Sequence, residues 1–335
     1  MTTIDVDRSF AELTEPLRGE ITAHCYRMLG SVHDAEDLVQ ETYLRAWRAF
    51  HGFEGRSSVR TWLHRIATNA CLNALESRQR RPLPTGLGQP ASDPSGALRT
   101  REEVPWLEPL PDDLVWGRPD AEPGEQTVSR ESVRIALVAA LQHLTPQQRA
   151  VVVLRDVLAW QAKEVAETLD MTVAGVNSTL QRARVQLAKL EGGLERPAPV
   201  LDDARSRRML AAYVAAFEEY DVPRIVSLLA EDAVWEMPPF DGWYRGAEAI
   251  GTLISTNCPA DAPGDQVLVP VSGNGQPCFG LYMRGEDGVH RAFQIQQLTV
   301  GEHGVEHVVA YFDLSLFARF GLPETLPADR VPRTA

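Results

Sequence analysis

The stretch from residue 173 to residue 187 has side chains that could hydrogen-bond to the edges of DNA bases. A glutamine amide can pair with adenine, and an arginine guanidinium can reach guanine or a phosphate. On a helix of about 3.6 residues per turn, the apolar residues of this stretch share one face. The opposite face and its flanks are small or hydrogen-bonding, as a helix in the major groove requires: Ala174, Asn177, Ser178, Gln181, Arg182 and Val185.

A second helix and a tight turn must hold that face in place. Residues 165–169 supply an apolar edge, and residues 170–172 supply the turn. This order of elements is typical of helix-turn-helix proteins, although an ordinary pair of packed surface helices would show the same local pattern. Further upstream, TPQQ at 145–148 predicts a helix start, with Thr145 as N-cap, proline at the first helical position and glutamine three residues after the cap.

The chain also has residues suited to an unstacked single strand. A helix is expected after residue 58, with Trp62 near its start. Aromatic rings stack on bases, while cationic side chains follow the phosphate backbone. The alternative is that Trp62 lies in the core and the arginines only solvate the helix. The side chains expected to point outward are Arg60, His64, Arg65, Asn69 and Asn73.

An earlier expected helix, over residues 34–50, has a different outer face. Its inner face is apolar. Residues 9–80 as a whole are expected to be almost continuous helix, with breaks near Gly30 and around residues 51–58. The outer face of the 34–50 helix is polar and acidic: Asp34, Asp37, Gln40 and Glu41.

Acidic residues outnumber basic ones, whereas DNA binding normally relies on a basic surface. The 335 residues include 46 acidic and 33 basic ones, a formal net charge of −13. Residues 1–84 are neutral, with 11 of each sign, and residues 132–195 carry +1, with 6 acids and 7 bases. The excess lies in residues 85–131 (10 acids, 4 bases) and 196–335 (19 acids, 11 bases). The acidity is therefore remote from the helix-turn-helix, and unaided binding to duplex DNA is disfavoured.

Composition indicates a globular protein of more than one domain. Hydrophobic residues make up 44% and charged residues 24% of a chain too long for one ordinary core. The first residues lack an apolar segment and the aliphatic runs are short, so neither a signal peptide nor a membrane span is expected. The four cysteines have no paired spacing, which favours reduced thiols in a cytoplasmic protein without disulfides or a zinc site.

Three stretches together resemble bacterial RNA polymerase sigma factors of the extracytoplasmic-function (ECF) group, in the sigma-70 superfamily. DAEDLVQETYLRAW resembles the core-binding segment of that family, FEGRSSVRTWLHRIATNACLNAL its promoter-melting segment, and LTPQQRAVVVLRDVLAWQAKEVAETLDMTVAGVNSTLQRAR its helix-turn-helix domain. Asp170 stands at a turn position where glycine is frequent. The resemblance implies two all-α domains, sigma region 2 over 9–81 and sigma region 4 over 130–191, joined by an acidic, proline-rich linker over 82–129.

The resemblance also implies partners and site residues. The partners would be promoter DNA and core RNA polymerase, through the clamp of its largest subunit and the flap of the second-largest, which residues 144–158 would face. Docking on the clamp would use Asp34, Asp37, Leu38, Val39, Gln40 and Glu41. The −10 element would be bound by Arg60, Trp62, His64, Arg65, Asn69 and Asn73. The −35 element would be bound by Lys163, Asn177, Ser178, Gln181, Arg182 and Arg184.

After a second linker over 192–201, helices precede a series of strand-rich runs, which indicates an α+β domain. Residues 202–322 resemble the SnoaL-like polyketide-cyclase superfamily, whose cone-shaped, cystatin-like fold curves a sheet around a cavity; residues 323–335 would be a tail. Three roles stay open for this domain: a regulatory module that packs on the sigma domains or the linker, a ligand sensor, or an enzyme. Candidate cavity residues are Trp235, Trp243, Tyr244 and Tyr282, and candidate acid–base residues are Glu236, Asp241, His290 and Asp313.

The regulatory module is the favoured interpretation, because no acid–base pair follows from spacing and a fold does not give a function. Neither catalysis nor a cofactor is expected. Residues 303–307, HGVEH, fit a zinc-binding pattern, but the pattern needs a helix and the neighbouring runs predict a hairpin, so no metal is expected. The alternatives to a sigma factor are a ligand-responsive DNA-binding regulator and a polyketide-cyclase-type enzyme fused to a DNA-binding region.

Overall fold

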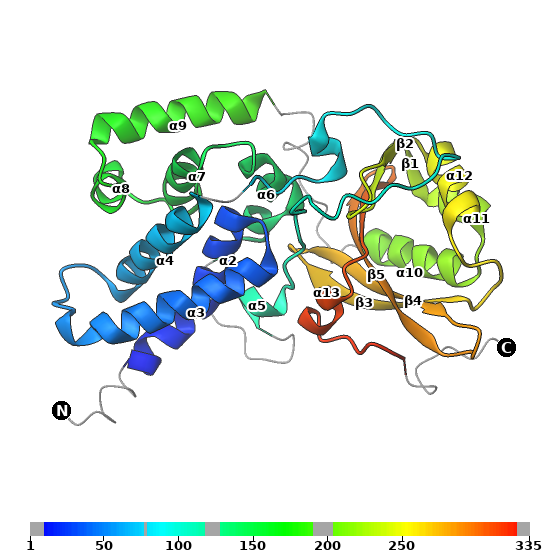
Figure 1. Ribbon diagram of the computed structural model, residues 1–335, viewed down its shortest axis with the longest axis horizontal. Coiled ribbons are helices and arrows are strands. Elements are labelled where there is room, and N and C mark those ends of the chain that lie inside the picture. Colours follow the sequence, from blue (N-terminus) through cyan, green and yellow to red (C-terminus); the bar gives the residue numbers. More distant parts are fainter. Residues whose placement is uncertain (1–9, 77–78, 118–127, 190–203, 327–335) are drawn as a thin grey trace. The chain divides into compact units, whose positions relative to one another are not determined.

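The computed structural model describes residues 10–76, 79–117, 128–189 and 204–326. The chain divides into two compact units (Figure 1). Residues 1–81 and 107–195 form the helical unit, and residues 82–106 and 196–335 form the C-terminal unit. Within the described ranges, no helix is both long and apolar enough to cross a bilayer. The segment 82–106 therefore belongs with the C-terminal unit, although both of its neighbours in sequence belong to the helical unit.

The first half of the helical unit is a group of three main helices. Gly30 ends the first in the left-handed conformation, with φ 71°, and Ser31 and Ser58 cap the other two. A side chain at position 30 would meet Leu107 and Gln142 at about 3 Å. These boundaries confirm the breaks expected near Gly30 and around residues 51–58. The elements are η1 (Glu15–Leu17), α2 (Arg18–Leu29), α3 (Val32–Ala49), η2 (Phe50–Gly52) and α4 (Val59–Leu75).

The second half of the helical unit ends in the helix-turn-helix. The helix start expected at Thr145 is confirmed, because its hydroxyl accepts from the Gln148 N–H (3.3 Å) and the Gln148 Oε1 accepts from the Thr145 N–H (3.0 Å). Pro146 occupies the first helical position. The elements are α5 (Asp113–Trp116), η4 (Arg130–Val133), α6 (Ile135–Leu141), α7 (Pro146–Val152), the π-helical turn η5 (Val153–Val157), α8 (Ala162–Leu169) and α9 (Val173–Ala188).

Each half of the helical unit inserts a buried arginine into the other. Arg27 of α2 donates from Nε to the Ser132 carbonyl (2.8 Å) and from Nη2 to the Ser132 hydroxyl (2.6 Å). Arg149 of α7 donates to the Met28 carbonyl and to the Gln142 Oε1. Burial lowers the pKa of both guanidinium groups to about 10. Both arginines therefore stay charged at neutral pH, and removing a partner would leave a buried charge unpaired, which is costly.

The C-terminal unit is an α+β domain in which helices α10, α11 and α12 cover one face of a curved sheet (Figure 1). The strand order is β2-β1-β6-β5-β4-β3. β1 and β6 run parallel, and the other neighbours run antiparallel. The strands are β1 (Leu229–Glu236), β2 (Trp243–Arg245), β3 (Gln266–Gly273), β4 (Gln276–Arg284), β5 (His290–Gly301) and β6 (Gly304–Tyr311). The helices are η3 (Pro84–Leu87), α10 (Ala204–Glu218), α11 (Val222–Leu228), α12 (Ala247–Asn257) and α13 (Ser315–Arg319).

Aromatic side chains fill the space between these helices and the sheet. Tyr213 of α10 stacks on Phe279 of β4, with ring centroids 6.1 Å apart, and Phe217 stacks on Trp235 of β1 at 6.3 Å. Burial of each such ring contributes roughly 1.5–3 kcal/mol. The fold class expected from the sequence is confirmed in its layout: helical domains followed by a C-terminal α+β domain with a curved sheet.

Residues 89–101, called the strap below, run along the C-terminal unit and bond to it mainly through main-chain groups. The Ser92 N–H donates to the Trp243 carbonyl (2.8 Å), and the Arg101 N–H donates to the Pro239 carbonyl (2.8 Å). In return, the Asp241 N–H donates to the Arg99 carbonyl (3.0 Å). The sequence predicts only a linker here; the structure adds that its first half packs as part of a folded domain.

Candidate nucleic-acid interface

The outer face of α9 presents a row of polar and small side chains. Asn177, Ser178, Gln181 and Arg182 are all exposed, as the sequence predicts for a helix that enters a groove. The Arg182 guanidinium donates to the Ser178 hydroxyl (2.8 Å) and, from Nη2, to the Thr179 hydroxyl (3.1 Å). These bonds hold the guanidinium along the helix while leaving other N–H groups to donate. The face can therefore offer both an amide and a guanidinium to base edges.

Arg184 and Lys163, which also belong to the predicted −35 set, are placed differently. The Arg184 Nε and Nη2 donate to the two carboxylate oxygens of Asp156, at 3.0 and 2.6 Å. The hydrogen bond to Asp156 raises the pKa of this arginine. Lys163 is exposed on α8, the helix before the turn. Arg184 thus faces the preceding turn η5, whereas Lys163 remains available to a phosphate.

The turn between α8 and α9 uses an aspartate where a glycine would be the usual choice. Asp170 caps α8 in the left-handed conformation, with φ 51° and ψ 50°. Aspartate is one of the few side chains that tolerate this conformation. Thr172 then caps α9, because its hydroxyl accepts from the Gly175 N–H (3.0 Å). The departure from glycine at position 170 is therefore compatible with the turn.

The outer face of α4 has exposed Arg65, Asn69 and Asn73 at four-residue spacing. Residues four apart lie above one another on a helix, so the three side chains form one continuous stripe. Trp62 is partly exposed one turn earlier, and its ring lies 4.8 Å from that of Phe53. The stripe combines a cation, two amides and an aromatic surface. This is the chemistry that a single strand with unstacked bases requires.

Two members of the predicted −10 set are engaged within the protein. Arg60 donates to both carboxylate oxygens of Glu20, at 2.7 and 2.9 Å. His64 is fully buried, with Nε2 at 2.7 Å from Glu20 Oε1 and its ring edge-on to that of Trp160, with centroids 6.0 Å apart. Trp160 belongs to the second half of the helical unit, so His64 lies between the two halves.

The groups around His64 form a buried ionisable cluster. Burial lowers the pKa of His64 and, more strongly, that of His24, whose ring is edge-on to it at 5.0 Å. Burial alone would raise the pKa of Glu20, but hydrogen bonds from His64 and Arg60 outweigh that effect and the pKa is lowered. The cluster therefore favours neutral histidines beside an ionised carboxylate. It stabilises helix packing and is no surface for DNA.

The outer face of α3 is acidic and also apolar. Asp37 and Gln40 are exposed and Glu41 partly so, whereas Leu38 and Val39 are buried. Leu44 and Trp47, which the sequence pattern did not single out, are 56% and 46% exposed on the same helix. Leu44 lies one to two turns after Gln40 and Asp37, on the same side. Large apolar side chains exposed beside polar ones are typical of a protein-binding surface. Both are apolar residues that do not belong to the inner face of the helix, and this departure from the pattern could have predicted their exposure.

Asp34 is tied to the second half of the linker. Its carboxylate accepts from Arg81 Nη2 at 2.7 Å, and the same guanidinium reaches Glu108 Oε1 at 3.3 Å. Glu108 also accepts from the Ser31 hydroxyl at 2.8 Å and contacts the His33 ring nitrogen at 2.9 Å. Leu107, beside it, is fully buried. The chain from residue 107 to residue 110 therefore packs into the helical unit.

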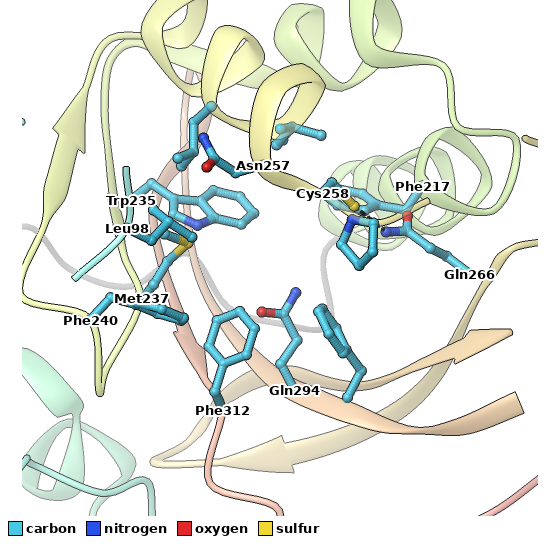
Figure 2. Close-up of a pocket in the computed structure, with 14 residues that line it drawn as sticks. Leu98, Phe217, Trp235, Met237, Phe240, Asn257, Cys258, Gln266, Gln294 and Phe312 are labelled. Carbon is cyan, nitrogen blue, oxygen red and sulfur yellow. Dashed lines mark hydrogen bonds between the residues drawn. The ribbon is translucent and has the colours of Figure 1, made fainter. Parts of the chain in front are cut away.

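A cavity of about 340 Å³ lies inside the C-terminal unit (Figure 2). Of the four aromatic residues predicted around a cavity, Trp235 lines it. Trp243, Tyr244 and Tyr282 are not among the lining residues. Trp243 donates from Nε1 to the Gln89 carbonyl (2.9 Å) and Tyr282 donates its hydroxyl proton to the Pro323 carbonyl (2.8 Å). Tyr244, one of the buried core residues, pairs in register with Trp235.

The four acid–base candidates lie outside the cavity lining as well. Glu236 accepts from His307 and, through Oε2, from the Thr85 N–H at 2.7 Å. The predicted hairpin at residues 303–307 is confirmed, because Gly301 pairs with Gly304 where β5 turns into β6. The last residue of that stretch, His307 in β6, bonds to another strand: its Nε2 lies 2.8 Å from Oε1 of Glu236, which belongs to β1.

Comparison with known proteins identifies the helical unit. The family models for Sigma-70 region 2 and Sigma-70 region 4 match residues 13–81 and 134–187. The chain belongs to the ECF RNA polymerase sigma factors of the sigma-70 superfamily, a family without catalytic activity. It is 56% identical to the ECF sigma factor SigG of Mycobacterium tuberculosis over 317 residues, which cover 95% of this chain and 85% of that one.

A second relative is similar in sequence and in fold. The ECF sigma factor SigJ of Mycobacterium tuberculosis is 30% identical over 230 residues, or 66% of this chain and 62% of that one. The crystal structure of SigJ superposes with a TM-score of 0.57 at 23% identity, covering 92% of this chain and 98% of that one. That likeness extends over the C-terminal unit and shows a shared fold.

Proposed function

We propose that this chain joins core RNA polymerase in the cytoplasm and directs it to promoters with two recognition elements, without catalysis of its own. The outer face of α3 would dock on the clamp of the largest subunit, and residues 144–158 would face the flap of the second-largest. The stripe on α4 would hold unpaired −10 bases, and the face of α9 would read the −35 element. The observation that carries this proposal is that three exposed faces of distinct chemistry arise from the segments that match sigma regions 2 and 4.

The charge distribution supports a role that depends on a polymerase partner. The helical unit has 24 acidic and 20 basic residues, and the C-terminal unit has 22 acidic and 13 basic ones. Neither unit has the basic excess with which proteins hold duplex DNA unaided. Core polymerase would supply most phosphate contacts, while α9 selects the sequence. The working domains in this proposal are region 2 over 9–81, region 4 over 130–191 and the SnoaL-like domain over 202–322.

We further propose that the C-terminal unit regulates the sigma unit through the linker and by contact with the sigma domains. The support lies in the path of the linker: residues 82–106 are part of the C-terminal unit, and residue 107 re-enters the helical unit. Both ends of the segment are covalently joined to helical-unit residues that are themselves fixed, by the Arg81 ion pairs and by buried Leu107. A change in the C-terminal unit would therefore act directly on the linker between regions 2 and 4.

Exchange of Leu44 for aspartate tests the docking face. The change places a charge on an exposed position, so folding should be retained, whereas a buried apolar contact with the clamp would be lost. We expect the affinity for core polymerase, measured by competition for a labelled sigma factor, to fall by about tenfold or more. Leu314→Asp is the matched control, since Leu314 is 54% exposed in the C-terminal unit. Equal affinities of the two variants would remove α3 from the docking surface.

A further inference from the structure

The cavity of the C-terminal unit is closed on one side by the strap. Leu98 of the strap forms part of its wall, together with residues of β1, β3, β5, α10 and α12. Figure 2 shows Leu98 beside Trp235 and Met237 at one edge of the hollow. Because the wall includes a residue of the linker between regions 2 and 4, the shape of the cavity depends on where the linker lies.

The lining defines the chemistry of a ligand. Ten lining side chains are apolar, and the other four are Asn257, Cys258, Gln266 and Gln294; none carries a formal charge at neutral pH. A charged molecule would lose its hydration there without an opposite charge to replace it, which is costly. A volume of about 340 Å³ lies at the lower end of the usual range for small-molecule sites.

Three polar atoms around the cavity are buried and have no hydrogen-bond partner among the residues that the structure describes: Trp235 Nε1, Gln266 Oε1 and Gln294 Oε1. The three side chains are 3%, 2% and 6% exposed. The Gln294 amide extends into the middle of the hollow in Figure 2. Buried polar groups are normally paired, so a ligand with one acceptor for the indole N–H and one donor for an amide oxygen would satisfy two of the three.

The strap is bonded to two residues that also line the cavity. Asn257 donates from Nδ2 to the Pro94 carbonyl at 3.3 Å. Phe240 pairs with Thr100 in an isolated antiparallel bridge. The next residue, Asp241, donates its N–H to the Arg99 carbonyl. The cavity wall and the strap therefore share hydrogen-bonded residues, and neither can shift without affecting the other.

We propose that this cavity binds a neutral, largely apolar small molecule with at least one hydrogen-bond acceptor and one donor, and that the bound molecule holds the strap in place. A ligand that packs against Leu98 would lose that contact if the strap left. Linkage requires the converse: a docked strap must strengthen binding by the same factor by which the ligand strengthens docking. The ligand would thereby fix half of the linker between sigma regions 2 and 4.

Binding of three related probes to the full-length chain tests the ligand class. 4-Hydroxybenzophenone has a carbonyl acceptor and a hydroxyl donor, diphenylmethane has neither, and 4-benzoylbenzoate is an anion of similar shape. We expect the hydroxyl-ketone to bind saturably, and about tenfold more tightly than either of the others. Gln294→Leu should lower its affinity toward that of diphenylmethane. Tightest binding of the anion, or no saturable binding of any neutral probe, would overturn the proposed chemistry.

Hydrogen exchange in the same samples tests the coupling to the strap. The Ser92 and Arg101 amides donate to the C-terminal unit, so 4-hydroxybenzophenone should slow their exchange by about the factor that its concentration over Kd predicts. Leu98→Ala should weaken probe binding by about threefold to tenfold and reduce the protection of these amides from exchange. Leu314→Ala, at an exposed position, should change neither. Probe binding without added protection of these amides would refute the coupling. Both measurements need no polymerase, so their outcome is separate from that of the proposed sigma activity.

Discussion

At the scale of single residues, the faces assigned to DNA differ in how their cations are held. Arg182 is held along the surface of α9 by two neutral hydroxyl groups, whereas Arg184 is held by the carboxylate of Asp156. A guanidinium bonded only to hydroxyl groups has no carboxylate partner to give up when it turns to a base. One that is paired with a carboxylate must first break a two-point ion pair.

Exchange of Arg182 for alanine should therefore change promoter preference. If the contact with a base edge is direct, its loss costs about 1–3 kcal/mol of discrimination at one position of the −35 element. The measurement is transcription by the holoenzyme from templates with each −35 position varied. Arg184→Ala serves as the control and should leave the preference almost unchanged. The same preference profile for Arg182→Ala and the unaltered chain would exclude Arg182 from the readout.

The buried histidines predict a pH dependence of stability. His24 and His64 have lowered pKa values in the folded chain, chiefly because they are buried, whereas in the unfolded chain they titrate near the ordinary value of about 6.5. As the pH falls through that value, the unfolded state takes up protons that the folded state does not, so the free energy of unfolding decreases. Urea titrations followed by helical circular dichroism between about pH 7.5 and 5.5 measure this slope. His24→Gln should make this slope shallower, whereas His51→Gln, at an exposed position, should not. Equal slopes for the unaltered chain and both variants would contradict a role of the buried histidines in the pH dependence.

At the scale of elements, the linker is the part that sequence described least well. Composition predicts a loop over 82–129, but not that residues 89–101 bond to one unit while residues 107–110 pack into the other. The strap is held largely by main-chain groups of Ser92, Arg99 and Arg101, and main-chain bonds leave no signature in the side chains. By contrast, Gly30 and Thr145 bond to residues only three or four positions away. The helix end and the helix start could therefore be predicted from the local sequence.

The same difference between local and long-range interactions explains which site residues could be predicted from the sequence. Asn177, Gln181 and Arg182 could be assigned to an outer face because helical periodicity decides it locally. The burial of His64 depends on Glu20, 44 residues away, and on Trp160 in another helix. The cavity likewise depends on which of several aromatic residues the curvature of the sheet turns inward, and Trp235 alone of the four candidates lines it.

Exchange of Leu107 for alanine tests whether the second half of the linker belongs to the helical unit. Leu107 is fully buried beside Gly30, so its truncation should leave a cavity and lower the free energy of unfolding by about 2–5 kcal/mol. Urea unfolding followed by circular dichroism measures the loss. Val104→Ala, a half-buried position in the other unit, should leave the unfolding of the helical unit unchanged. A loss below about 1 kcal/mol for Leu107→Ala would show that this segment is only a tether.

At the scale of the whole molecule, the charge of −13 no longer conflicts with a DNA-reading helix. Most of the acidity lies in the C-terminal unit, and the helical unit is only slightly acidic. A sigma subunit needs to choose a sequence, whereas the polymerase holds the phosphates. This chain should therefore show promoter preference only together with core enzyme.

Transcription in vitro from fragments of the genome that encodes the chain, with sequencing of the transcript 5′ ends, tests that requirement most directly. Core polymerase with the full-length chain should start at a defined set of sites that share two upstream elements, and scrambling either element should abolish initiation there. Neither core enzyme alone nor the chain alone should select those sites. Sequence-specific duplex binding by the chain without polymerase, or start sites that are the same with and without it, would contradict the account.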